Sequence, residues 1–180
     1  MPGAVDVLSS RPRCCGGMNA VPAHSPRPTA RVLLLDRSDR ILLMRGRLPG
    51  RAEGPASWFT VGGGLEPGET HHEAAAREIL EETGITAFEL GPVVWIREGV
   101  LHIPEPRYFQ EQYILARCDG VEPERAGWTE LELDLIDDIR WWTLAELAGT
   151  EDRVFPPGLA SLLPPVLAGA FPDEPLRIPW

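Results

Sequence analysis

Three glutamates, Glu78, Glu81 and Glu82, crowd a short segment that follows a glycine-rich loop. If the segment is helical, their spacings of three and four residues place the side chains on one face. Like charges at these spacings destabilise a helix by about 0.2–0.5 kcal/mol per pair. Mg²⁺ and Mn²⁺ prefer oxygen ligands and usually combine one or two carboxylates with water and substrate phosphate. The cluster therefore indicates a divalent-metal site that faces a phosphate, and the alternative is a solvated acidic face.

The boundaries of this segment are well marked. Thr70 and Glu73 have the spacing of a capping box, in which each side chain accepts from the other residue's backbone N–H. Gly84 suits a helix C-terminus because glycine takes positive φ without strain. The pattern predicts a helix over 71–83. The glycines at 62–64 allow the preceding backbone to turn sharply and approach a cation or a phosphate.

The predicted helix has two distinct sides when residues are placed at about 100° each. All three glutamates fall on one side, which we expect to face solvent. Arg77 lies four residues before Glu81 and offers it one ion-pair partner. The opposite side, expected to face the core, carries Ala76, Ile79, Leu80 and Thr83.

The elements that must position this helix fit into one globular domain. The chain has 180 residues, 43% of them hydrophobic, which is enough for a single core. We expect a flexible N-terminal tail over 1–27, the domain over 28–170 and a proline-rich C-terminal tail over 171–180. Strand-like runs before and after the helix favour the α+β class, and the first two could form a hairpin. The runs cover 30–36, 40–45, 58–61, 88–101, 108–117 and 139–143, and short helices are expected at 144–148 and 157–169.

Charge and composition exclude several classes of partner. A net charge of −10 argues against binding to a nucleic acid polymer or to an anionic membrane surface. A small anionic substrate is compatible if metal ions offset the local charge. The sequence has no apolar run long enough for a membrane span, no signal-peptide pattern and only three cysteines, so a cytoplasmic protein is expected. The oligomeric state is open, and a homodimer is compatible with the sequence.

The loop and the helix together match the Nudix box, G-x5-E-x7-R-E-U-x-E-E-x-G-U, in which U is a bulky aliphatic residue. All nine specified positions are met in one register, from Gly63 through Glu69 and Arg77 to Ile85. The chain therefore resembles the Nudix hydrolases. This resemblance implies a Nudix fold, with a mixed β-sheet sandwiched between α-helices (α/β/α) and the box as a loop–helix–loop.

The resemblance also implies a reaction and a cofactor. The family hydrolyses a phosphoanhydride bond in a nucleoside diphosphate linked to another moiety, and the cofactor would be Mg²⁺ or Mn²⁺. We expect a small nucleotide substrate of the nucleoside triphosphate or nucleotide-sugar type. The alternative is a non-catalytic Nudix-like module that senses a nucleotide. Such modules usually lose box glutamates, whereas this chain keeps them all.

The resemblance assigns roles to individual residues of the box. Glu78, Glu81 and Glu82 would hold the metal, and Glu81 and Glu82 would also act in catalysis. Arg77 would orient a glutamate through a salt bridge. Metal ions that bridge the phosphate oxygens would neutralise their charge and acidify a bound water.

Further residues extend the predicted site. Gly63 and Gly64 would shape the loop next to the substrate and the metal, and Arg45 could contact a substrate phosphate or be a surface charge. A carboxylate must take the proton of the attacking water. It could belong to the box or to a later acidic loop, where we favour Glu132. That loop also carries Glu124 and Glu130, and its alternative role is simply a solvated segment.

Aromatic residues leave two interpretations open. Trp58, Phe59 and Tyr108 could stack on a base, although aromatic residues in short strands more often belong to a core. Trp141 and Trp142 are adjacent in a predicted strand. They should point to opposite faces of the sheet, so at least one of them should be buried.

Overall fold

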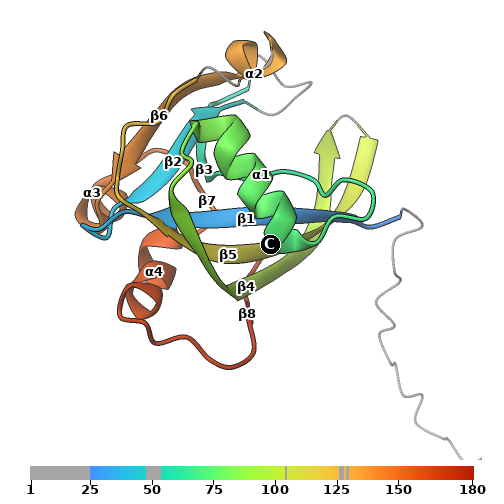
Figure 1. Cartoon of the computed structure of the whole chain (residues 1–180). Coiled ribbons are helices and arrows are strands. Elements are labelled where there is room, and N and C mark those ends of the chain that lie inside the picture. The colour runs from blue at the N-terminus through green and yellow to red at the C-terminus, as the bar shows by residue number, and fades with distance from the viewer. Residues whose placement is uncertain (1–24, 48–53, 104, 126–127, 129) are drawn as a thin grey trace, which may run out of the picture.

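The computed structural model describes residues 25–47, 54–103, 105–125, 128 and 130–180. A mixed sheet forms its centre, with helices around it (Figure 1). The strands are β1 (Arg27–Leu35), β2 (Ile41–Gly46), β3 (Ser57–Thr60), β4 (Phe88–Ile103), β5 (Glu105–Cys118), β6 (Ile136–Trp142), β7 (Val154–Phe155) and β8 (Leu176–Arg177). The helices are α1 (His71–Thr83), α2 (Glu130–Leu135), α3 (Leu144–Gly149) and α4 (Leu159–Leu167).

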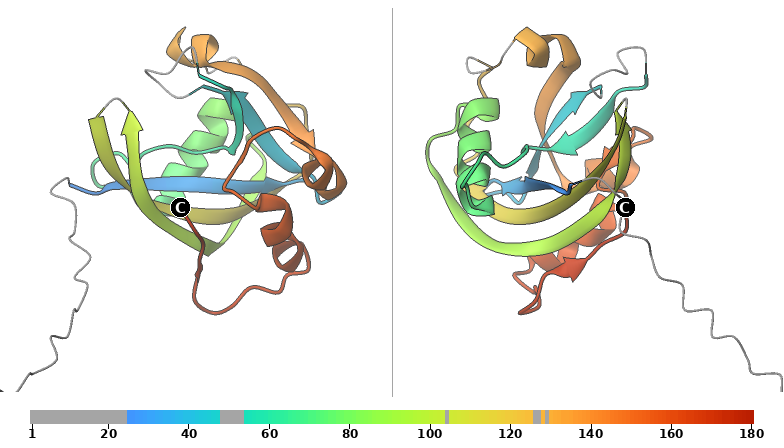
Figure 2. Two further views of the ribbon diagram at one scale, coloured as in Figure 1. Left: turned by 180° about the vertical axis from the view of Figure 1, so that it is seen from behind. Right: turned by 90° about the vertical axis from the view of Figure 1, so that its right-hand side faces the viewer.

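Strand β1 is the centre of the sheet. It pairs with β5 in parallel and with β2 in the antiparallel sense. The strand order is β7-β3-β2-β1-β5-β4-β8, and β6 pairs with β2 outside this path. Strands β4 and β5 form a long antiparallel pair that curls strongly (Figure 2). The mixed sheet and the separate helices confirm the α+β class.

The hairpin of β1 and β2 is also confirmed, with Leu35 opposite Ile41. Asp36 closes its turn, because its carboxylate accepts from the backbone N–H groups of Ser38 and Arg40, both at 2.8 Å. Asp39 adopts a φ of 57°, a left-handed conformation that aspartate tolerates better than most residues. The turn is therefore set by local aspartate chemistry.

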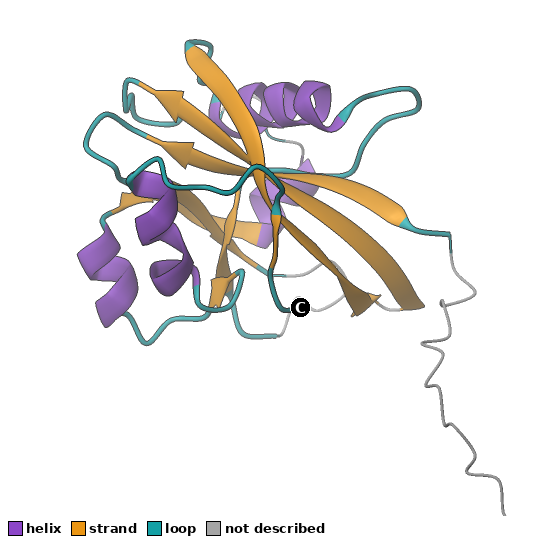
Figure 3. Ribbon diagram, turned by 90° about the horizontal axis from the view of Figure 1, so that it is seen from below, coloured by secondary structure: helices purple, strands orange, loops and turns teal. Residues whose placement is uncertain are grey.

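Both faces of β1 are buried, which accounts for its unbroken apolar run. Val32 and Leu34 pack toward α1, whereas Leu33 and Leu35 pack toward α3 and α4. Figure 3 shows helices on both sides of the strands. The sheet is thus the middle layer of an α/β/α sandwich, as the resemblance implied.

The tryptophans mark these two cores. Trp141 belongs to the core on the α1 side and Trp142 to the other, so both are buried and the predicted alternation is confirmed. Trp58 packs edge-on against Trp142, with ring centroids 4.9 Å apart, and is 3% exposed. Trp58 is therefore a core residue and does not face a ligand.

Helix α1 has the predicted bounds, but its orientation differs from the prediction. The capping box of Thr70 and Glu73 is formed, and Gly84 ends the helix with φ of 68°. Leu80, expected in the core, is 50% exposed. Two of the glutamates expected in solvent, Glu78 and Glu82, are buried. The buried side of the helix carries Ala74, Ala75, Glu78, Ile79, Glu82 and Thr83.

The reason for this difference is the way in which the helix packs on the sheet and the loop. Ala74 and Ala75 are small, so the first turns of α1 approach the sheet closely there. The glycine loop, rather than solvent, then lies over the glutamates at 78 and 82. Helical periodicity places residues on a common face, but it does not show whether water or a loop covers that face.

The remaining helices are short. α3 begins with a second capping box, formed by Thr143 and Glu146. α4 includes Pro164 and Pro165, within the predicted helix. Helix α2 lies within the segment that the sequence predicted as an acidic loop. None of the described helices is long and apolar enough to cross a membrane.

The C-terminal residues lie along the sheet. Strand β8 pairs in parallel with β4, and Ile178 is buried in the core on the α4 side. The ring of Trp180 stacks on Phe109, with centroids 6.2 Å apart. The segment expected as a proline-rich tail thus packs on the domain, whereas most of the expected N-terminal tail lies outside the described residues.

The observed orientation of α1 can be tested with two neighbouring variants. Ile79→Ala should lower the free energy of unfolding by about 2–5 kcal/mol, because it opens a cavity in a buried site. Leu80→Ala is the control and should change it by no more than about 0.5 kcal/mol, because Leu80 faces water. Urea unfolding measures both. Equal losses of unfolding free energy would mean that Ile79 and Leu80 are both buried, as helical periodicity alone predicts.

Candidate active site

A glycine loop joins β3 to α1 and lies along β1. The backbone N–H groups of Ala30 and Val32 donate to the carbonyls of Gly63, at 2.9 Å, and Val61, at 2.8 Å. Gly62 lies between these with φ of 131°, and a Cβ there would overlap the Ala30 carbonyl. The loop can follow β1 this closely only because residue 62 has no side chain.

Two glutamates of α1 press their carboxylates against this loop. Glu82 accepts from the Gly62 N–H through Oε2, at 2.8 Å. A Cβ on Gly63 would overlap the Glu78 carboxylate. The residues are only 9% (Glu78) and 8% (Glu82) exposed. The glycine loop and these two glutamates, which the sequence predicted as site residues, therefore lie in contact where the loop meets the helix.

Arg77 connects the acidic residues of the helix and the loop. Its Nε and Nη2 donate to the two carboxylate oxygens of Glu69, at 2.9 and 3.0 Å, in a fork. Its Nη1 donates to Glu78, at 2.9 Å, and to Glu81, at 3.0 Å. Nη2 also donates to the Gly64 carbonyl, at 3.1 Å. One guanidinium thus joins three carboxylates and the loop backbone.

These contacts shift the pKa values of the charged side chains. The hydrogen bonds from Arg77 and from the Glu66 N–H lower the pKa of Glu69. The Glu69 hydrogen bond, aided by Glu78, raises the pKa of Arg77 despite its partial burial. Burial raises the pKa of Glu78, and the attraction of Arg77 does not cancel that effect. Glu78 is therefore a carboxylate that further positive charge nearby would stabilise.

The residues fit a divalent cation in two respects. Arg77 Nη1 lies within hydrogen-bonding distance of both Glu78 and Glu81, so a positive group already lies between these carboxylates. Glu81 is also half exposed and can turn on its own. Among the described residues, no three His, Cys, Asp or Glu side chains already converge on one point. A metal ion would thus have to take over the Nη1 contacts.

Two other predicted site residues, Gly64 and Arg45, contact different strands of the sheet. Gly64 forms an isolated bridge with Thr29 of β1. Arg45 points to Asp137, with Nη1 at 3.1 Å from the carboxylate, and Arg47 binds the same carboxylate at 2.8 Å. Arg45, on β2, is therefore paired with Asp137 of β6 and, among the described residues, forms no hydrogen bond or ion pair with the box.

The later acidic loop packs on the end of α1. The Glu124 N–H donates to the Thr83 carbonyl at 2.8 Å, and the Trp128 indole donates to the Glu82 carbonyl at 2.6 Å. Both bonds satisfy carbonyls that the last helical turn leaves open. The backbone of Glu132, predicted to lie in this loop, belongs to helix α2, and its side chain lies outside the described residues. Its role as a base therefore stays a prediction.

A buried charged cluster lies next to the loop, and the sequence pattern did not indicate it. Glu111 of β5 is 3% exposed and accepts from Arg31 Nε at 3.1 Å, Arg97 Nε at 2.8 Å and the Tyr113 hydroxyl at 3.0 Å. Arg31 also donates from Nη1 to the Gly62 carbonyl, at 2.9 Å. The available signal was a single arginine, Arg31, within the otherwise apolar run ARVLLL of β1.

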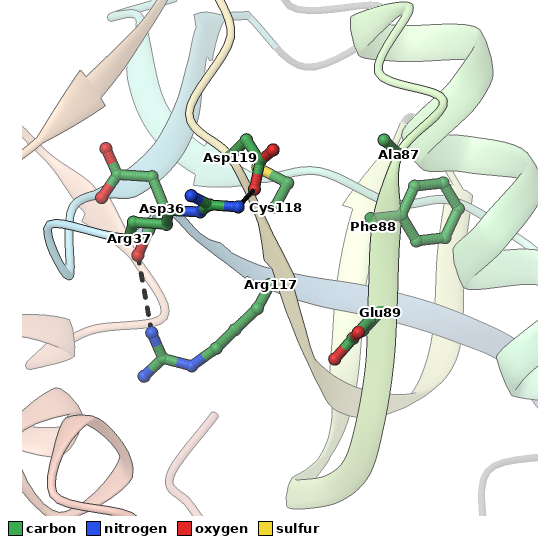
Figure 4. A pocket seen from close by; sticks show the side chains of 8 residues that line it. All are labelled: Asp36, Arg37, Ala87, Phe88, Glu89, Arg117, Cys118 and Asp119. Carbon is green, nitrogen blue, oxygen red and sulfur yellow. Dashed lines mark hydrogen bonds and ion pairs between the residues drawn. The ribbon is translucent and has the colours of Figure 1, made fainter.

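One pocket lies away from the box. It has a volume of about 480 Å³ and is formed by the end of β5, the start of β4 and the β1–β2 turn (Figure 4). Its arginines are paired: Arg37 with Asp119 at 2.7 Å, and Arg117 with Asp39 at 2.9 Å. Burial raises the pKa of the Cys118 thiol there, which disfavours the reactive thiolate. We therefore place the candidate site at the loop and α1.

The chain is similar in sequence to known proteins. The family model for the NUDIX domain matches residues 25–163. A curated protein of Bacillus subtilis (strain 168), named "Putative 8-oxo-dGTP diphosphatase", is 35% identical over 105 residues, which are 54% of this chain and 62% of that protein. "Nudix hydrolase 26, chloroplastic" of Arabidopsis thaliana is 33% identical over 84 residues, 47% of this chain and 36% of that protein. The chain therefore spans less than two thirds of either relative.

Solved structures share the fold at low sequence identity. A Nudix hydrolase from Nitrosomonas europaea superposes with a TM-score of 0.62 at 21% identity, covering 82% of this chain and 92% of the other. A MutT Nudix hydrolase from Burkholderia pseudomallei gives a TM-score of 0.55 at 24% identity, covering 76% and 96%. At these identities the likeness concerns the fold alone.

The contact between loop and helix can be tested with glycine variants. Gly63→Ala should lower the free energy of unfolding by about 1–3 kcal/mol, because the new Cβ displaces the Glu78 carboxylate. Gly149→Ala is the matched control and should be neutral or slightly stabilising, because nothing lies within 4 Å of its Cβ position. Urea unfolding without metal measures both. A Gly63→Ala protein as stable as the control would show that Glu78 does not rest on the loop.

Proposed function

This chain belongs to the NUDIX family, and we propose that it hydrolyses a phosphoanhydride bond in a nucleoside diphosphate linked to another moiety, with Mg²⁺ or Mn²⁺ as cofactor. The observation that carries the proposal is the folded box itself. Arg77 binds Glu69, Glu78 and Glu81, and Glu82 rests on the Gly62 N–H. All four carboxylates are thus held around one loop, which a merely solvated acidic face would not require.

In this proposal Glu78, Glu81 and Glu82 hold the metal. The bound cation would neutralise phosphate charge and lower the pKa of a water ligand. Arg77 keeps its fork on Glu69 and its bond to the Gly64 carbonyl, so it stays anchored when Nη1 releases its two carboxylates. The Gly62 N–H fixes the direction of the Glu82 carboxylate. The protein therefore contributes orientation and a carboxylate that can accept the proton of the attacking water.

The substrate we favour is a nucleoside triphosphate. This rests on the name of the Bacillus subtilis relative, which is a diphosphatase for 8-oxo-dGTP by that name. A nucleotide-sugar type is the second choice. A small nucleotide suits an acidic chain better than a nucleic acid polymer does, because the net charge is −10. A homodimer and a cytoplasmic location stay predictions from the sequence.

The hydrolase is tested by phosphate and pyrophosphate release. The panel contains (d)NTPs with 8-oxo-dGTP, nucleotide-sugars, ADP-ribose and dinucleoside polyphosphates, each with and without Mg²⁺. Glu82→Gln should lower kcat by about 10²–10⁴-fold, the range for loss of a general acid or base. Glu151→Gln, at an exposed position, is the control and should match the wild type. Tight nucleotide binding without turnover on any compound would instead favour a sensing module.

The role of Arg77 is tested by a change that keeps its charge. Arg77→Lys cannot form the fork on Glu69 and reach the other two carboxylates at once. Mn²⁺ affinity should fall by about 10–100-fold, as is usual when residues that orient metal ligands are lost. Isothermal titration calorimetry measures this, with Arg37→Lys, in an exposed ion pair, as the control. An unchanged affinity would mean that Arg77 does not orient the glutamates.

A further inference from the structure

We propose that Glu111 and Arg31 are positioning residues for this hydrolytic site, because they hold the backbone of Gly62 and thereby the carboxylate of Glu82. The inference rests on the proposed function. It assigns a role to the cluster of Arg31, Glu111 and Arg97, which lies on β1, β5 and β4 and includes no residue of the Nudix box.

The path from the cluster to the helix consists of direct contacts. Glu111 holds Arg31 through Nε, at 3.1 Å, which fixes the plane of the guanidinium. Nη1 of Arg31 then reaches the Gly62 carbonyl, at 2.9 Å. On the other side of the same residue, the Gly62 N–H donates to Glu82, at 2.8 Å. Gly62 is therefore held at its carbonyl by β1 and at its N–H by α1.

The loop needs such a constraint at this residue. Gly62 has φ of 131°, and glycine has more accessible backbone conformations than any other residue, so it is the least restrained by its own sterics. A rotation of its backbone would turn the N–H away from Glu82. The bond from Arg31 to the carbonyl opposes that rotation. Arg31 thus helps to fix the direction of Glu82 through the backbone of Gly62.

Stability alone does not account for the cluster. Buried ion pairs are often no more stabilising than apolar residues of the same volume. On the same face of the sheet, the next residues of β1 and β5 are Leu33 and Tyr113, which belong to the core. The charges begin where this core ends and the glycine loop crosses β1. The charged residues therefore lie where the loop runs along β1, and not at positions that the core requires.

The C-terminal segment closes the cluster from the outside. The ring of Trp180 lies 4.5 Å from the Arg97 guanidinium, and its indole N–H donates to the Val100 carbonyl at 3.2 Å. A Cβ on Gly99 would overlap this ring, so β4 leaves room for it. Arg97 is consequently 7% exposed. Exclusion of water strengthens its attraction to Glu111 and keeps that carboxylate in place.

Glu111→Gln and Arg31→Lys are the variants that test the inference. Glu111→Gln keeps the shape but removes the charge that holds Arg31. Arg31→Lys keeps a charge beside Glu111, yet an ammonium cannot form the two separate contacts of the guanidinium with the same geometry. The control is Glu98→Gln, which removes a carboxylate from β4 that binds Tyr108 and Arg177 and has no contact with the loop.

Two measurements on metal-free protein, at a temperature where circular dichroism shows it folded, decide the outcome. Mn²⁺ affinity, from the electron paramagnetic resonance signal of free Mn²⁺, should fall by about 10–100-fold in both test variants and stay unchanged in the control. The NMR amide proton of Gly62 should shift in both test variants and not in Glu98→Gln. A merely structural role would lower the melting temperature and leave both readings unchanged in the folded protein.

The results separate this inference from the proposed function. If the wild type binds Mn²⁺ and hydrolyses a nucleotide while folded test variants match it in both readings, the positioning role is wrong and the hydrolase stands. If Glu111→Gln does not fold, Arg31→Lys decides alone. If the wild type neither binds Mn²⁺ nor hydrolyses any substrate, both proposals fall together.

Discussion

The contact between two buried carboxylates and a loop without side chains is the constraint on which this structure depends. Glu78 and Glu82 can turn toward the sheet only because Gly63 and Gly62 leave room and supply an N–H. Three like charges in the C-terminal half of a helix are unfavourable for that helix alone. Arg77 and the loop backbone offset this cost locally. The three like charges, unfavourable for the helix alone, are thus tolerated where the loop and the helix meet.

The sheet positions this contact between the glycine loop and helix α1. β1 lies at the centre, and its backbone N–H groups hold the loop at Val61 and Gly63. The same strand is buried on both faces, so it cannot move without disrupting both cores. The side chain of Arg31 extends from β1 at the point where the apolar core ends. A rigid strand, a loop bonded to it and a helix resting on the loop together form one unit.

Local patterns in the sequence determined much of this protein. The bounds of α1 follow from Thr70, Glu73 and Gly84, because capping needs only neighbouring residues. The hairpin of β1 and β2 and the opposite orientations of Trp141 and Trp142 follow from strand periodicity. The nine positions of the box indicate the family without reference to the fold. All of these features depend on residues close together in the chain.

Only the tertiary structure decided which side of α1 is buried. Periodicity grouped the glutamates correctly, but whether water or the glycine loop covers them depends on how the helix docks on β1. The cluster of Arg31, Arg97 and Glu111 likewise joins three strands whose residues are far apart in the sequence. No local pattern can show such a pairing, because the register of β1, β5 and β4 brings it about. The sequence by itself indicated the chemistry that we propose for the site, and the sheet decided which residues of distant strands contact the glycine loop.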